Sequence, residues 1–162
     1  KILNYKTNTI PPLNKKGLVI SSTLIRKNIT KGKISLANKM LGRPWSIEGK
    51  VKRGDKRGRK IGFPTCNLDL KSYVVPKLGV YSSQIIINKK IKKKGIVNIG
   101  YRPTFGKNKL VLEAHIFSFK KNLYDKSIKI MLTKFIRNEK KFKNVVQLKK
   151  QISKDIKDAK IN

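Results

Sequence analysis

Between Ile47 and Phe135 the chain repeats one pattern, in which a short apolar segment is followed by glycine, proline or asparagine and then by another apolar segment. Short runs rich in Ile, Val and Leu and bounded by turn formers are typical of β-strands. The spacing predicts strands at 47–51, 80–87, 91–97, 110–119 and 127–135. Five or six strands with connections of this length favour a mainly β fold, a small antiparallel Greek-key barrel.

Helical periodicity is expected at the two ends of the chain. A helix over 145–160 that lies on the barrel is predicted from apolar residues at helical spacing, namely Val145, Leu148, Ile152, Ile156 and Ala159. Upstream, the hydroxyls of 21–23 offer an N-cap to one short helix, and 34–41 fits a second that ends at Gly42. Residues 1–46 hold too few apolar side chains to fold alone, so we interpret them as the end of a preceding domain.

The net charge suggests one alternative function. With 41 Lys and Arg against 8 Asp and Glu, the formal charge is +33, which would suit an RNA-binding barrel. The lysines are, however, scattered over tail, loops, strands and helix, as compositional drift in an AT-rich genome would produce. We favour drift and expect no specific nucleic-acid partner, although a weak, salt-sensitive attraction to nucleic acid follows in either case.

Other classes of protein are disfavoured by what the sequence lacks. No apolar run approaches the roughly 18–20 residues that span a bilayer, and residues 1–18 lack the apolar block of a signal peptide. The single cysteine, Cys66, excludes an internal disulfide and cannot build a zinc site. We therefore expect a cytoplasmic protein without a membrane segment. Because the first residue is Lys1, we also expect the sequence to be part of a longer chain.

Residues 52–67 form a basic, glycine-rich stretch. Gly54, Gly58 and Gly62 recur every four residues among six Lys or Arg side chains, and such a backbone can approach and neutralise a phosphate. The spacing is not that of a P-loop, and a basic, glycine-rich stretch taken alone is more often a flexible, solvated connection. Thr65 and Asn67 follow Pro64 and should point to the same side of an extended segment, where their oxygens could help to hold a Mg²⁺–nucleotide complex.

The predicted strand 110–119 places Glu113 on a largely apolar face, shared with Val111, His115, Phe117 and Phe119. Apolar surroundings raise the pKa of a carboxyl group, which suits a general base, but a surface glutamate paired with one of the many lysines is equally compatible with the pattern. His115 is the only histidine and is more typical of a packed residue than of a catalyst.

Residues 98–106 read as a loop that is rich in turn formers and carries an aromatic residue near each end. Such a loop could simply connect two strands. Aromatic side chains and an arginine on a stiff loop would also suit binding of a flat ring.

Together these segments resemble the riboflavin kinase family from about Ile47 to the C-terminus. The strings that carry the resemblance occur in one order: Gly54-Asp55-Lys56-Arg57-Gly58-Arg59, Gly62-Phe63-Pro64-Thr65-Cys66-Asn67-Leu68, Pro76-Lys77-Leu78-Gly79-Val80-Tyr81, Asn98-Ile99-Gly100, Arg102-Pro103-Thr104-Phe105-Gly106, Leu112-Glu113-Ala114-His115-Ile116-Phe117, Leu123-Tyr124, Ile136-Arg137-x-Glu139-x-x-Phe142 and Leu148-x-x-Gln151-Ile152-x-x-Asp155. The resemblance implies a six-stranded antiparallel Greek-key barrel with a C-terminal helix over 47–162. It also implies transfer of the γ-phosphate of ATP to riboflavin, with Mg²⁺, to give FMN.

The resemblance also implies roles for individual residues. Glu113 corresponds to the catalytic base, and Thr65 and Asn67 to the ligands of Mg²⁺ and the ATP phosphates. The nucleotide-binding residues would be Gly54, Arg59, Gly62, Pro64, Thr65 and Asn67. The candidates for the flavin side are Tyr81, Phe117, Arg137 and Phe142. A kinase-like barrel that binds flavin without turnover is a further alternative.

Upstream, the pattern from Ile20 to Pro44 is similar to the end of the FMN adenylyltransferase domain that precedes the kinase in bacterial FAD synthetases. The HxGH-type signature of that domain is absent, so this chain is not expected to adenylylate FMN. Within the kinase part, Cys66 replaces a usual Ala, Ser118 a common Asp and Asp125 a common Gly. Asp tolerates a left-handed turn, so the turn at Asp125 should survive.

Overall fold

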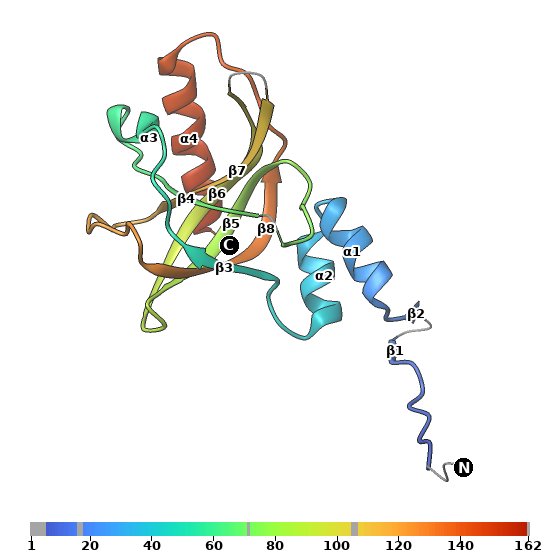
Figure 1. Cartoon of the computed structure of the whole chain (residues 1–162). Helices are drawn as coiled ribbons and strands as arrows, with labels where there is room; N and C mark the ends of the chain where they lie inside the picture. The colour runs from blue at the N-terminus through green and yellow to red at the C-terminus, as the bar shows by residue number, and fades with distance from the viewer. Residues whose placement is uncertain (1–5, 16–17, 71, 105–106, 162) are drawn as a thin grey trace.

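The centre of the computed structural model, which describes residues 6–15, 18–70, 72–104 and 107–161, is a six-stranded antiparallel sheet that curls into a nearly closed barrel (Figure 1). The strands of the barrel are β3 (Ser46–Lys50), β4 (Cys66–Leu68), β5 (Gly79–Ile87), β6 (Ile91–Thr104), β7 (Lys107–Ile116) and β8 (Ser127–Arg137). One helix, α4 (Val145–Lys160), lies against β5, β6 and β8. Two shorter helices, α1 (Ser22–Thr30) and α2 (Ile34–Leu41), lie on another side, where α2 packs on β8.

The strand order β3-β8-β5-β6-β7-β4 contains a Greek key. Strands β5, β6 and β7 follow one another as neighbours, and β8 returns to pair with β5. The two edge strands, β3 and β4, approach each other through an isolated bridge between Lys52 and Asn67, where the Lys52 amide donates to the Asn67 carbonyl at 2.9 Å. The predicted Greek-key barrel is confirmed, and this bridge is its seam.

Strand β6 is longer than the sequence suggested. We predicted a loop from Asn98 onward, but residues 98–104 continue β6 and pair with 107–113 of β7. This prediction is wrong because Val97 and Ile99 are buried while Asn98 lies between them on the other face, so the alternation of a strand continues past the turn formers. Tyr101 is exposed on this strand, and Phe105 and Gly106 lie outside the described residues.

Strand β7 ends earlier than predicted, at Ile116 instead of Phe119. The chain turns at Ser118, which adopts a left-handed conformation with φ of 52°. Phe117 and Phe119 therefore do not continue the strand face that carries Glu113, which corrects our grouping of these residues. The expected turn at Asp125 is confirmed, because its φ is 63°.

Four short elements were missed in the sequence. Strand β4 has only three residues, helix α3 (Arg57–Lys60) has four, and β1 (Asn14–Lys15) pairs with β2 (Leu18–Val19) in a two-residue hairpin. Elements of this length show too few periods to be recognised from a hydrophobic pattern. Helix α3 lies within the glycine-rich stretch that we had expected to be a loop.

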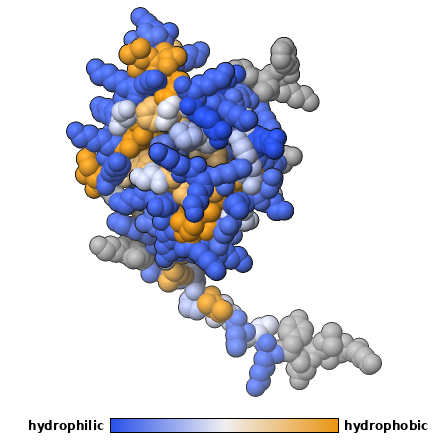
Figure 2. Space-filling model, turned by 90° about the vertical axis from the view of Figure 1, so that its left-hand side faces the viewer, coloured by the Kyte–Doolittle hydropathy of each residue, from blue (hydrophilic) through white to orange (hydrophobic). Residues whose placement is uncertain are grey.

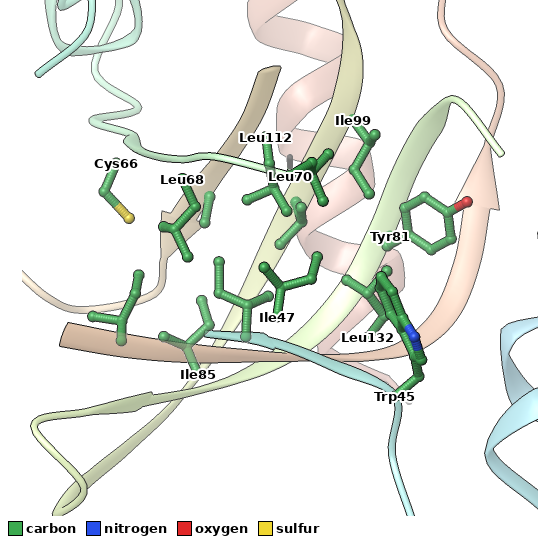
Figure 3. Packing of buried hydrophobic residues seen from close by; sticks show 14 of the residues in the cluster. Trp45, Ile47, Cys66, Leu68, Leu70, Tyr81, Ile85, Ile99, Leu112 and Leu132 are labelled. Carbon is green, nitrogen blue, oxygen red and sulfur yellow. The ribbon is translucent and has the colours of Figure 1, made fainter. Parts of the chain in front are cut away.

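The barrel is filled by side chains from the inner faces of all six strands (Figure 3). Ile47, Ile85, Leu112 and Ile130 are completely buried. Each fully buried aliphatic side chain of this size contributes roughly 1.5–3 kcal/mol through removal of apolar surface from water. Tyr81 also belongs to this cluster, with its ring edge-on to Phe135 at 5.1 Å between centroids.

Helix α4 covers the outer face of the sheet and creates a second apolar cluster. Its Ile152, Ile156 and Ala159 pack against Val80 and Ile96, together with Ile136 and Phe117. Asn144 caps the helix by accepting a hydrogen bond from the Gln147 amide at 3.0 Å. The predicted helix and its position on the barrel are confirmed, and both faces of β5 and β6 are therefore partly buried.

Helices α1 and α2 are joined to the barrel by packing and by side-chain hydrogen bonds. Ile29, Ile34 and Ala37 are buried in the same cluster as the barrel interior. The Asn38 amide donates to the Leu132 carbonyl at 2.9 Å, while its side-chain oxygen accepts from the Trp45 amide at 2.7 Å. Ser21 caps α1, and Gly42 ends α2 in a left-handed conformation, as predicted.

The surface is predominantly hydrophilic on the face shown in Figure 2, where apolar residues form separate patches. The chain before α1 extends away from the barrel and exposes Ile10 and Leu13 (Figure 1). In the part of the chain that the structure describes, no helix is both long and apolar enough to span a membrane.

Candidate active site

Two cavities open on either side of the segment that leads into β4. The first, of about 380 Å³, we call the basic cavity; it is lined by Val51, Arg59, Pro64, Thr65, Cys66, Ala114, Ile116, Phe119, Lys120, Lys121, Asn122, Leu123 and Tyr124. The second, of about 520 Å³, we call the carboxylate cavity; it lies between β6, β7 and α4 and includes Asp55, Thr65, Asn67, Asn98, Glu113, His115, Arg137, Glu139, Phe142 and Asp155. Both volumes fall within the roughly 300–1,000 Å³ of small-molecule sites.

The two cavities differ in charge. Arg59, Lys120 and Lys121 line the basic cavity, and none of its described lining residues is acidic. Four of the eight acidic residues in the chain line the carboxylate cavity, where four cations accompany them: Lys56, Arg57, Arg137 and Lys140. The local charge is thus positive in one cavity and balanced in the other.

Thr65 lines both cavities. Strand alternation turns Cys66 into the barrel interior (Figure 3). Thr65 and Asn67 both border the carboxylate cavity, as predicted for positions i and i+2. Burial raises the pKa of the Cys66 thiol to about 12, so the thiol is almost entirely neutral near pH 7 and is a poor nucleophile. The small Cys side chain fills an interior position beside Ala114, its cross-strand partner.

The glycine-rich segment wraps closely around these polar residues. A side chain at Gly54 would overlap the Asn67 amide, and one at Gly58 would overlap the Phe63 carbonyl and lie 3.4 Å from the Thr65 hydroxyl. Gly58 is therefore required for close approach of the backbone, whereas a side chain at Gly54 would displace the Asn67 amide. Arg59 and Pro64 border the basic cavity. Gly62 lies at the end of α3 with φ of 91° and lines neither cavity.

Glu113 is half-buried on the outer face of β7 and lies between two amide side chains. Its cross-strand partners are Asn67 on β4 and Asn98 on β6. The surroundings are therefore more polar than the largely apolar face we expected, because the apolar face of β7 is the opposite one, with Leu112 and Ala114 in the core. Directly opposed residues have Cβ atoms about 4.5–5.5 Å apart, so the carboxylate and the two amides share one site.

His115 lies two residues after Glu113 on the same strand face. Its Nδ1 is 2.8 Å from the Pro64 carbonyl, and because a carbonyl can only accept, Nδ1 carries the proton. The ring is edge-on to Phe63 at 5.8 Å and tilted against Phe117 at 5.9 Å between centroids. The packed role that we expected for His115 is confirmed, and it includes a hydrogen bond to the segment that carries Thr65.

Arg137 is fixed at the floor of the carboxylate cavity by a buried ion pair. Its Nε donates to Asp155 Oδ1 at 2.8 Å and its Nη2 donates to Oδ2 at 2.7 Å, while Gln151 donates to the same carboxylate at 2.8 Å. Asp155 is only 1% exposed. Bulges in β8 place Arg137 opposite Val80 and thus on the face that α4 covers. One N–H on each terminal nitrogen of Arg137 has no acceptor within the described part of the chain.

Phe142 and Glu139 complete the wall above Arg137. The Arg137 guanidinium lies 5.9 Å from the centroid of the Phe142 ring. The Glu139 carboxylate packs against the backbone at Gly100, where any side chain would overlap it. Desolvation raises the pKa of Glu139, and the charge of Arg137 opposes that rise.

Two of the predicted flavin residues are not brought to either cavity. Tyr81 is completely buried in the barrel interior, and its hydroxyl donates to the Lys77 carbonyl (Figure 3). Burial also raises the pKa of this phenol. Phe117 is 9% exposed and packs under the end of α4, close to the ammonium of Lys160. These positions do not support a flavin contact for Tyr81 or Phe117, whereas Arg137 and Phe142 do line the carboxylate cavity.

Several lining residues were not assigned a role from the sequence. Asn98 was placed in a loop, and it would have been found had the alternation of β6 been followed past Val97. Asp155 and Glu139 stand in the matched strings, but no local pattern indicates that they approach Arg137. The turn from Phe119 to Tyr124 borders the basic cavity, but nothing in its sequence beyond its composition indicated a role in binding.

The residues that could hold a divalent ion are neutral oxygen donors. Among the described residues there is no cluster of three or more His, Cys, Asp or Glu that could hold a metal ion. Thr65 and Asn67 offer a hydroxyl and an amide oxygen beside Glu113. This donor set fits Mg²⁺, which is held largely by substrate phosphates and water and requires few protein ligands.

Comparisons with known proteins agree with this architecture. The family model for riboflavin kinase (flavokinase) matches residues 41–162. The bifunctional riboflavin kinase/FMN adenylyltransferase of Buchnera aphidicola subsp. Schizaphis graminum is 46% identical over 158 residues, which cover 94% of this chain and 50% of that protein. The protein of the same name from Bacillus subtilis is 44% identical over 144 residues, which cover 86% of this chain and 45% of the relative. The chain thus spans about half the length of the curated relatives it matches.

A solved structure is similar over nearly the whole chain. It is described as a macrolide-efflux protein from Streptococcus pneumoniae, and it superposes with a TM-score of 0.86 and 34% identity, covering 93% of this chain and 50% of the other. The family match runs from residue 41 to the last residue, over a Greek-key barrel with two adjoining cavities, and the chain belongs to the riboflavin kinase family.

Proposed function

We propose that this chain is an ATP:riboflavin 5′-phosphotransferase, which transfers the γ-phosphate of ATP to the 5′-hydroxyl of riboflavin to give FMN and ADP. The observation that carries the proposal is the position of Thr65, whose side chain borders both cavities. A group held in one cavity can meet a group held in the other only near such a residue. Family membership supports the same reaction.

The nucleotide is assigned to the basic cavity. Arg59, Lys120 and Lys121 supply positive charge for a polyphosphate, and Phe119 and Tyr124 supply apolar surface for a base. The segment with Gly54, Gly58 and Gly62 would close over the phosphates where the two cavities meet, because Arg59 lines the basic cavity and Gly58 lines the carboxylate cavity. Its backbone already packs closely around Thr65 and Asn67, which supports this role.

Riboflavin is assigned to the carboxylate cavity, which is larger and has no net positive charge. Its walls combine apolar side chains of α4 and the barrel, such as Leu148, Ile152 and Ile96, with polar groups at one end. This combination suits a flat, neutral ring that carries a hydroxylated chain. The polyol would extend toward Glu113, with the ring beside Phe142 and Arg137.

The chemistry then follows from the polar end of the cavity. Glu113 accepts the proton of the 5′-hydroxyl as the oxygen attacks the γ-phosphorus, and the bond from that phosphorus to the bridging oxygen of ADP breaks. Asn98 and Asn67 flank Glu113 and orient it. Holding both reactants in line supplies most of the rate enhancement in such a transfer.

Mg²⁺ fits the reaction as an ion held by the phosphates with Thr65 and Asn67. When bound, it neutralises negative charge on the transferring phosphoryl group. The residues of the chain contribute orientation: the Thr65 hydroxyl and the Asn67 amide lie on one face of the chain beside Glu113.

The test is direct. The purified chain is incubated with riboflavin, ATP and Mg²⁺, and flavins and nucleotides are separated by chromatography. We expect FMN and ADP in equal amounts, and neither when ATP or the divalent ion is omitted. A folded chain that binds riboflavin but forms no FMN would contradict the proposal and favour a non-catalytic flavin-binding protein.

The adenylyltransferase activity in the names of the relatives is not assigned to these residues. We infer that residues 1–46 correspond to the end of such a domain and its linker. The same assay tests this inference, because we expect no FAD when FMN and ATP are supplied to this chain.

A further inference from the structure

The hydrogen bond from His115 to Pro64 crosses the wall between the two cavities. His115 borders the carboxylate cavity and Pro64 borders the basic cavity. The donor belongs to the strand that carries Glu113, and the acceptor directly precedes Thr65. One contact of 2.8 Å therefore connects the segments that carry the proposed base and the proposed phosphate ligand.

This hydrogen bond takes the place of a backbone pair that does not form between β4 and β7. Strand β4 pairs with β7 from Leu68 to Cys66, and its next residue, Thr65, would stand opposite His115. The ladder stops there, and Pro64 has no N–H with which to extend it. The imidazole of His115 supplies a donor to the Pro64 carbonyl instead, so the chain stays close to β7 for two residues beyond the end of the strand.

The imidazole ring is itself held on two sides. Phe63 meets it edge-on, with an interplanar angle of 80°, and Phe117 packs at 56°. These contacts limit rotation of the ring and keep Nδ1 directed at the Pro64 carbonyl. The segment from Phe63 to Thr65 is thus fixed both by packing on the ring and by the hydrogen bond from it.

We infer that His115 is a positioning residue for phosphoryl transfer, which holds the Pro64–Thr65 peptide so that the Thr65 hydroxyl borders both cavities. The inference rests on the proposed kinase function. His115 acts through Thr65 and not on the substrates. Loss of its hydrogen bond should release Thr65 and affect the nucleotide and the transfer step more than the binding of riboflavin.

Two substitutions of His115 distinguish the contribution of its hydrogen bond from that of its ring packing. His115→Phe keeps an aromatic ring between Phe63 and Phe117 but removes the donor. His115→Asn removes the ring but keeps an amide donor near the position of Nδ1. We expect kcat to fall roughly 10- to 100-fold in His115→Phe because Thr65 is misplaced. His115→Asn should recover most of that loss. Because His115 also borders the carboxylate cavity, the riboflavin Kd is measured as well, and in His115→Phe it should change less than the MgADP Kd.

A double-substitution cycle distinguishes positioning from a general loss of structure. If His115 acts through Thr65, then His115→Phe should reduce kcat further by less than about twofold in a Thr65→Ala background, since coupled residues are not additive. Full additivity, an unchanged kcat in His115→Phe, or an equal loss in His115→Asn would each overturn the inference. Circular dichroism of every variant establishes that it is folded.

A binding measurement keeps the inference testable if the parent chain forms no FMN. Affinity for MgADP, measured by calorimetry, should fall about 2- to 10-fold in His115→Phe, as expected for one lost hydrogen bond, and should be restored in His115→Asn. Absence of FMN with this pattern of affinities would contradict the proposed function alone. Equal MgADP affinities in the parent and His115→Phe would contradict the positioning role.

Discussion

The basic cavity and the carboxylate cavity share Thr65 but are built in different ways. The basic cavity is bordered mostly by loop and turn residues, including 119–124, and its charged side chains are exposed cations. The carboxylate cavity is bordered by strands and by α4 on one side and by the glycine-rich segment with α3 on another, and one of its charges, Asp155, is buried and ion-paired. The charge of the first cavity is therefore exposed and of one sign, whereas the second combines exposed charges with a buried, hydrogen-bonded ion pair.

Under the proposed function, the difference explains how a chain of charge +33 would bind both an anion and a neutral ring. Positive charge over the whole surface raises the local concentration of nucleotide without any specific contact. A neutral ligand gains nothing from that field, so its site depends on shape and directed hydrogen bonds. Half of the acidic residues surround one cavity and balance the charge of its lining where a neutral ligand is expected.

The largest effect is expected from Glu113→Gln. The amide keeps the size of the side chain but cannot accept the proton, so FMN formation should fall roughly 10²- to 10⁴-fold. Fluorescence titration should show riboflavin binding close to that of the parent. The control is Glu48→Gln on β3, where an exposed carboxylate pairs with Lys129 at 2.8 Å and lines neither cavity. Turnover of Glu113→Gln near the parent level would exclude the proposed base.

Breaking the buried ion pair should have the next largest effect, and only on the carboxylate cavity. Asp155→Leu leaves Arg137 without its partner and should lower the free energy of unfolding by about 3–5 kcal/mol, measured with urea. The double variant Arg137→Met/Asp155→Leu should regain most of that stability, because an apolar pair of similar size can replace a buried ion pair.

Riboflavin affinity tests whether the ion pair serves more than stability. It should stay low in the double variant, since the guanidinium N–H groups are gone, while MgADP affinity should match the parent. Recovery of riboflavin affinity together with stability would show that Arg137 has only a structural role.

A rise in salt concentration should affect the KM values for the two substrates differently, with a smaller effect than the substitutions above. Raising ionic strength from about 50 to about 500 mM shortens the screening length severalfold, so the KM for ATP should rise severalfold while that for riboflavin changes little. Lys120→Gln/Lys121→Gln should weaken this salt dependence. Equal salt effects on both KM values would contradict the assignment of the nucleotide to the basic cavity.

The smallest expected effect is a change in the alkylation rate of Cys66, which would report whether a ligand occupies the basic cavity. With a thiol pKa of about 12, only about one thiol in ten thousand is ionised at pH 8, so alkylation should be slow and should quicken about tenfold per pH unit below that pKa. MgADP should slow the reaction further, as followed by mass spectrometry, and riboflavin alone should not. Protection by riboflavin alone would reverse the assignment of the two ligands.

The sequence predicted the elements whose periodicity is long and regular. The helix at 145–160 and the strands around Ile85, Leu112 and Ile130 each bury a repeating apolar face. The three-residue β4 escaped notice because it contains a single inward-facing pair, Cys66 and Leu68. The continuation of β6 through Gly100 was missed because turn formers dominate its composition although its pairing partner is a neighbouring strand.

Residues of the candidate site could be predicted from the sequence only where their polar groups recur within one segment of the chain. Thr65, Asn67 and Glu113 carry polar groups at strand spacing, and they do come together. Tyr81 lies away from both cavities for a physical reason: Val80 and Tyr81 point to opposite faces of β5, and both faces are apolar because one enters the barrel and the other meets α4. The pairing of Arg137 with Asp155 joins separate elements through a bulged strand, which no local pattern encodes.

The seam at Lys52 and Asn67 has a consequence for how this barrel can change. The glycine-rich segment leaves and returns at that single bridge, so its two ends are already neighbours in space. Insertions there add little closure entropy and leave the four longer ladders of the barrel in register. Because Arg59 and Pro64 of this segment line the basic cavity while Asp55, Lys56 and Arg57 line the carboxylate cavity, one replaceable segment can reshape both cavities without disturbing the barrel that supports them.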